Sequence, residues 1–143
     1  MAERPVYREI EHTADVGIEL VAPDRVTAFE RAAAAMFDTM CDLDRVRESW
    51  RGEVSVQGRP GDLEHLLVRW LTELLYLFEV RGLLLSGFQI EAFRDGAIEA
   101  RVVGEPYDPG RHELKVGIKA PTYHSMAVEQ KGGEWRVRVV FDI

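Results

Sequence analysis

The sequence has one cysteine, few lysines and no long apolar run, and each shortage argues against a class of protein. The single cysteine, Cys41, cannot form an internal disulfide, which favours a reducing compartment. No apolar signal segment follows the charged start of the chain, and charged residues interrupt the leucine-rich stretch at 63–78. We therefore expect a cytoplasmic protein with no membrane association.

The charge balance excludes a second class. Only three of the 18 basic residues are lysines, and the 25 acidic residues leave a net charge of −7. A surface that holds naked nucleic acid must neutralise many phosphates with basic groups, so tight direct RNA binding is disfavoured. Any connection with RNA is expected to be indirect.

The hydrophobic content is sufficient for one ordinary domain. The chain has 143 residues, 46% of them hydrophobic, which is enough for a core without disulfides or other staples. No internal repeat, low-complexity tract or linker divides it. We predict a single domain over residues 1–143.

Hydrophobic periodicity predicts two helices among about seven strands. Helical spacing covers 26–40, where Asp24 can cap the start, and 63–78, which Gly82 ends. Alternating patterns predict strands over 6–12, 16–22, 53–57, 88–92, 98–103, 115–120, 123–129 and 135–143. This order indicates an α+β, two-layer domain with both helices packed on one face of a mostly antiparallel or mixed sheet.

Acidic groups near both ends of the chain suggest a metal site. Asp15 lies at the break between two apolar alternations, and the final strand closes on Asp142 and Ile143. Period two places Ile143 on the same apolar face as Val139 and Phe141, so we expect burial to immobilise its main-chain carboxylate. If the ends meet, these oxygens form a cage for a hard divalent cation. Spacing alone leaves open that Asp142 is an ordinary exposed acid.

The histidines and a local basic cluster offer weaker signals. The four histidines lack the ligand spacing of a zinc site, and no Ser or Cys elbow suggests a catalytic triad. The basic cluster is either a solvated face or a contact for an anion or an acidic patch on a partner. The candidate partner or anion contacts are His12, Arg111, His112, Lys115, Lys119 and His124.

Four motifs in register resemble the archease family. They are His-Thr-Ala-Asp-Val-Gly-Ile at 12–18, Trp-Leu-Thr-Glu-Leu-Leu-Tyr at 70–76, Ile-Lys-Ala-Pro-Thr-Tyr-His at 118–124 and Phe-Asp-Ile at 141–143. The middle motifs are weak individually, but together the four cover essentially the full chain in order. Pro121 interrupts the third motif with a residue that lacks an amide donor, which suggests a sheet edge or bulge there.

The resemblance implies a non-catalytic protein cofactor of the RtcB-type RNA ligase, which joins tRNA halves in tRNA splicing. In that family the protein promotes guanylylation of the ligase and sustains turnover, in a chaperone-like role, with a bound divalent metal. Carried over by motif, the metal ligands are Asp15, Asp142 and the main-chain oxygen of Ile143. Calcium is the first expectation, with magnesium and manganese as alternatives.

Two other functions stay open at this point. One is a small metal-dependent phosphoesterase in which the same carboxylates hold a catalytic metal and His12 or His124 acts as general acid or base. The other is an interaction module without a metal.

Overall fold

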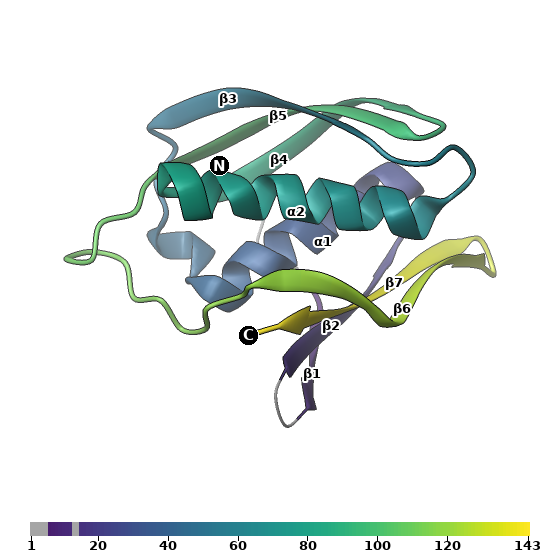
Figure 1. The fold of residues 1–143 in the computed structure, drawn as a ribbon, viewed down its shortest axis with the longest axis horizontal. Coiled ribbons are helices and arrows are strands. Elements are labelled where there is room, and N and C mark those ends of the chain that lie inside the picture. Colours follow the sequence, from purple (N-terminus) through teal and green to yellow (C-terminus); the bar gives the residue numbers. More distant parts are fainter. Residues whose placement is uncertain (1–5, 13–14) are drawn as a thin grey trace.

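The computed structural model describes residues 6–12 and 15–143, which form three layers with two helices between two sheets (Figure 1). The strands are β1 (Arg8–His12), β2 (Asp15–Ala22), β3 (Trp50–Gln57), β4 (Leu83–Arg94), β5 (Ala97–Pro106), β6 (Ala120–Lys131) and β7 (Glu134–Asp142). The helices are α1 (Arg25–Met40), α2 (Leu63–Arg81) and the short 3-10 turn η1 (Leu43–Arg45).

The strands are antiparallel throughout and form two sheets. One sheet has the order β1-β2-β7-β6, and the other has the order β3-β5-β4. The α+β class and the expected strand and helix numbers are therefore confirmed. The arrangement differs from the expected one in that the strands do not share one sheet with both helices on a single face.

The burial of α1 explains the second sheet. Every residue from Ala32 to Met40 is buried, so the helix has no solvent-facing side over this length. A helix that is buried all round must be covered from more than one direction. The alanines at 32–35 have small side chains, which lets the neighbouring layers approach the helix backbone closely.

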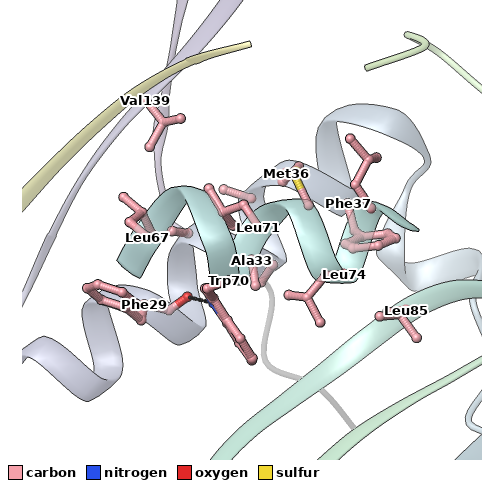
Figure 2. Packing of buried hydrophobic residues seen from close by; sticks show 14 of the residues in the cluster. Phe29, Ala33, Met36, Phe37, Leu67, Trp70, Leu71, Leu74, Leu85 and Val139 are labelled. Carbon is pink, nitrogen blue, oxygen red and sulfur yellow. Dashed lines mark hydrogen bonds between the residues drawn. The ribbon is translucent and has the colours of Figure 1, made fainter. Parts of the chain in front are cut away.

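Helix α2 follows its sequence signals closely. Asp62 caps its start by accepting a hydrogen bond from the His65 amide at 2.9 Å, and Gly82 ends it in the left-handed conformation at φ 66°. The indole Nε1 of Trp70, which is fully buried, donates to the Phe29 carbonyl of α1 at 3.0 Å (Figure 2). This bond joins the two helices inside the shared core.

The predicted strand over 115–120 is mostly absent. Residues 112–119 form no ladder, and β6 begins only at Ala120. The segment is instead fixed by two isolated bonds, from the Lys115 amide to the Met40 carbonyl at 2.7 Å and from the Lys119 amide to the Asp142 carbonyl at 2.8 Å. Alternation in the sequence therefore predicted a strand where the backbone forms no ladder.

The expected edge or bulge near Pro121 is confirmed. Strand β6 lies at the edge of its sheet, and its pairing with β7 shifts register between Thr122 and Ala127. Within this break Ser125 has φ 55°, a conformation that is uncommon for residues other than glycine. No helix of the described residues is long and apolar enough to cross a membrane.

Trp70→Phe should lower the free energy of unfolding by about 1–3 kcal/mol, because it removes a buried hydrogen bond between the two helices. Urea denaturation monitored by circular dichroism measures this loss. Trp135→Phe is the matched control, since Trp135 is only partly buried at the sheet rim. Equal losses in the two variants would show that the indole bond contributes nothing specific.

Candidate metal site

The ladder between β2 and β7 brings the two acidic ends together. Asp15 lies directly opposite Asp142 in the register, and Ala120 of β6 lies opposite Asp142 on its other side. Side chains directly opposite in an antiparallel pair have Cβ atoms about 4.5–5.5 Å apart. Two carboxylates at this spacing repel each other unless a cation lies between them.

The environment of Asp15 fits a cation ligand. Its Oδ1 atom is buried and has no hydrogen-bond partner within the part of the chain that the structure describes. Burial of a charged oxygen without a partner is unfavourable, and a bound cation would satisfy it. The side chain of Asp142 is exposed at the strand end, while its carbonyl accepts the Lys119 amide.

The side chain of Ile143 is 44% exposed, so the expected burial of this residue is wrong. The strand ends at Asp142, and Phe141 is the last buried residue of its apolar face. Beyond that point neither a ladder nor the core holds the side chain. The main-chain oxygens of Ile143 lie next to Asp142 along the chain.

The three predicted ligands all offer oxygen. Among residues 6–12 and 15–143, no three His, Cys, Asp or Glu side chains form a cluster that could hold a metal. A cation here would take the Asp15 and Asp142 carboxylates and main-chain oxygen from Ile143, with water completing its shell. Such ligands suit calcium, magnesium or manganese rather than zinc.

The predicted partner contacts do not form one surface cluster. Lys115, Lys119 and His124 are exposed, whereas His112 is only 3% exposed and cannot meet a partner with its ring. The backbone of His12, in β1, pairs with that of Asp15, in β2. The side chain of His12 and residues 13 and 14 lie outside the part of the chain that the structure describes.

His112 and Arg111 belong to a buried network around Glu105. The Nδ1 atom of His112 accepts the Asp108 amide at 2.9 Å, so its Nε2 donates to Glu105 Oε2 at 2.8 Å. Glu105 also accepts the Arg47 amide at 2.7 Å and a bond from the Arg111 guanidinium. The network fixes the loop at 107–112 against the end of β5.

The pKa of Glu105 reflects opposing effects. Burial alone would raise it, but the bonds from the Arg47 amide, His112 and Arg111 outweigh burial and hold the pKa below its ordinary value of 4.5. Sequence reasoning missed this network, in which Arg47 comes from a distant segment while Arg111 and His112 lie six and seven residues from Glu105. The available signal was an acid at the strand end shortly before an Arg-His pair.

Together, the fold and site define an α+β domain with two sheets around a helix pair and two facing carboxylates at a strand junction. Comparison with known proteins gives the family. The Archease protein family model matches residues 7–143, and the chain belongs to this family.

Curated relatives agree along nearly the whole chain. Protein archease of Methanopyrus kandleri is 39% identical over 140 residues, covering 96% of this chain and 99% of its own. Protein archease of Methanosarcina mazei is 40% identical over 141 residues, covering 96% of this chain and 95% of its own.

Two solved structures share the fold. Protein 1598 of Methanobacterium thermoautotrophicum superposes with a TM-score of 0.78 at 29% identity, covering 96% of this chain and 98% of its own. A Thermotoga maritima protein described as an archease and possible chaperone gives a TM-score of 0.66 at 18% identity, covering 99% and 100%. The second comparison supports the fold alone.

Glu105→Gln should destabilise the protein at neutral pH by about 1–3 kcal/mol, because it removes a buried charged acceptor. The lowered pKa means that the carboxylate stabilises the fold above pH 4.5, and that this contribution is lost as pH falls through the folded-state pKa. Denaturant titrations from pH 7 to acid pH should therefore show a steeper decline for the wild type than for the variant. Parallel declines would contradict this assignment.

Proposed function

We propose that this protein is a divalent-metal-binding accessory protein that activates an RtcB-type RNA ligase. The proposal rests on membership of the archease family and on one structural observation, the direct pairing of Asp15 with Asp142. The buried, unpartnered Oδ1 of Asp15 supports a cation between these residues.

Each residue has a distinct part in this proposal. Asp15 and Asp142 supply the negative charge, and main-chain oxygen of Ile143 supplies a further ligand. The Lys119–Asp142 backbone bond holds the strand end in place while the Asp142 side chain stays free to bind. A bound divalent cation would supply a positive centre able to meet anionic groups on the partner.

The partner in this proposal is the ligase protein, and tRNA is reached only through it. The net charge of −7 opposes the approach of a polyphosphate backbone. Filter binding of tRNA at physiological salt, without the ligase, should therefore show weak association. A tight complex under these conditions would favour a direct RNA-binding role.

Asp15→Asn and Asp142→Asn should each weaken calcium binding at least about tenfold, since even outer-shell changes at metal sites have effects of this size. Isothermal titration with calcium and manganese measures the affinity, and circular dichroism confirms the fold. Glu79→Gln is the control, because it removes one exposed carboxylate from α2 at a distance from the strand junction. Unchanged affinity in both Asn variants would rule out this metal site.

The same variants test activation. Ligation by the RtcB-type ligase is measured under multiple turnover with and without this protein, and guanylylation of the ligase is followed in parallel. Wild type and Glu79→Gln should stimulate both, and the two Asn variants should not. Phosphoesterase activity of this protein alone, lost in the Asn variants, would instead support a metal-dependent hydrolase.

A further inference from the structure

A groove crosses the outer face of the four-stranded sheet, on the side away from the helices. Its volume is about 630 Å³, and residues from β1, β2, β7 and β6 line it. The side chains of Leu20 and Val137 point to the core, so the alternating positions Glu19, Arg136 and Arg138 project outward into the groove.

An arginine–glutamate–arginine row forms one wall of the groove. Arg8 and Arg138 lie opposite Glu19 on its two sides in the ladder. Glu19 Oε2 accepts from Arg8 Nη2 at 2.5 Å, and Oε1 accepts from Arg138 Nη1 at 2.9 Å. Both oxygens of Glu19 are thus occupied, and the carboxylate holds the two guanidinium groups beside each other.

Donors remain after this pairing. Arg138 Nε is buried and has no hydrogen-bond partner among the residues that the structure describes, while the side chain as a whole is 34% exposed. Its Nε and Nη2 atoms form the edge of the guanidinium fork that faces away from Nη1. Arg136 lies in the next outward row, opposite Glu129, and its guanidinium makes no ion pair within residues 6–12 and 15–143.

The groove is locally positive in an acidic protein. Its lining contains three guanidinium groups and two carboxylates, whereas the whole chain has a net charge of −7. The charged lining residues are Arg8, Arg136, Arg138, Glu19 and Glu129. Val6 and Val21 are exposed and line part of the wall, so a ligand meets apolar surface beside the charges. This combination suits an anion attached to an organic group.

We propose that this groove binds a phosphate-ester anion. The N–H groups of Arg138 that Glu19 does not engage and the fork of Arg136 together offer more donors than the two oxygens of one carboxylate can accept, while a phosphate presents three oxygens. Glu19 keeps Arg138 oriented, so little side-chain entropy is lost on binding. The groove volume exceeds that of a bare phosphate and leaves room for the ester group.

This inference goes beyond the proposed function and does not depend on the metal. Glu19 and Arg138 lie four residues along their strands from Asp15 and Asp142, on the same face of the ladder. The two sites are therefore roughly 13 Å apart at 3.3 Å per residue. Experiments in excess chelator can test the groove while the metal site is empty.

The direct test is a titration of the full chain with inorganic phosphate, followed in ¹H–¹⁵N spectra of the arginine Nε–H groups. Sodium acetate and sodium chloride at equal ionic strength are the comparison arms, all in chelator. The Nε–H signal of Arg138 should shift saturably with phosphate and only slightly with acetate. Equal or tighter binding of acetate, or a linear shift equal to that of chloride, would overturn the proposal.

Two variants should act in opposite directions. Arg136→Gln should weaken phosphate binding about tenfold, the effect expected for loss of one charge-assisted hydrogen bond. Glu19→Gln should tighten it, because the groove gains one positive charge and Arg138 gains a free donor. A purely structural role of these residues would not give opposite signs.

Arg101→Gln is the matched control. Arg101 lies on the outer face of the three-stranded sheet and pairs with Glu91 at 3.1 Å, so it carries the same charge in a different setting. It should leave phosphate affinity unchanged. An equal loss in Arg101→Gln and Arg136→Gln would show that general charge, and not the groove, governs binding.

Two further ligands distinguish a phosphate group of a nucleic acid from that of a small phosphate ester. Glycerol phosphate should compete with inorganic phosphate at the Arg138 signal. An oligonucleotide without terminal phosphates should bind no better, because the guanidinium groups of the groove exceed its carboxylates by only one charge and the whole chain has a net charge of −7. Oligonucleotide binding much tighter than that of glycerol phosphate would overturn the single-ester site.

Discussion

The antiparallel ladder between β2 and β7 is the constraint on which both candidate sites depend. It places Asp15 opposite Asp142 at one end and Glu19 opposite Arg138 further along. Because side chains alternate between faces, a slip of β7 by one residue would turn Asp142 and Arg138 toward the core and expose Val139. The buried apolar face thus fixes the geometry of the polar one.

The core in turn holds that ladder in place. Helix α1 is covered by both sheets, and the Trp70–Phe29 bond ties α2 to it. Interiors are close-packed, so a shift of either helix is transmitted to the strands that contact it. Burial of Ile18, Val139 and Phe141 in the core consequently holds the register that pairs Asp15 with Asp142.

Local signals in the sequence predicted the elements well and their assembly less well. Helix α2 was predicted from its apolar spacing and the glycine at 82, because each signal acts within a few residues. The division into two sheets was missed, since strand alternation does not say which strands pair. Ile143 was wrongly expected to be buried because period two does not show where the core stops.

The polar networks were the least predictable features. Glu105 is reached by Arg47 from a distant segment, and Glu19 joins arginines from both ends of the chain. Only the pairing of Asp15 with Asp142 was predicted. The prediction came from the positions of these two acids at the ends of predicted strands near the two ends of the chain. Its role in metal binding stays a prediction.

The irregular strand edges have a consequence for how this protein associates. A straight exposed edge presents free amides and carbonyls to any other strand, and so invites edge-to-edge aggregation. Strand β6 breaks register around Ser125, and β4, at the edge of the other sheet, breaks it twice, after Leu85 and after Ile90. These kinks interrupt the template for strand addition at β6 and β4, whereas β1 and β3, at the opposite edges, pair with their neighbours in an unbroken register. Each sheet therefore has one edge that disfavours backbone pairing with another strand, and contacts made there must rely on side chains, which can be selective.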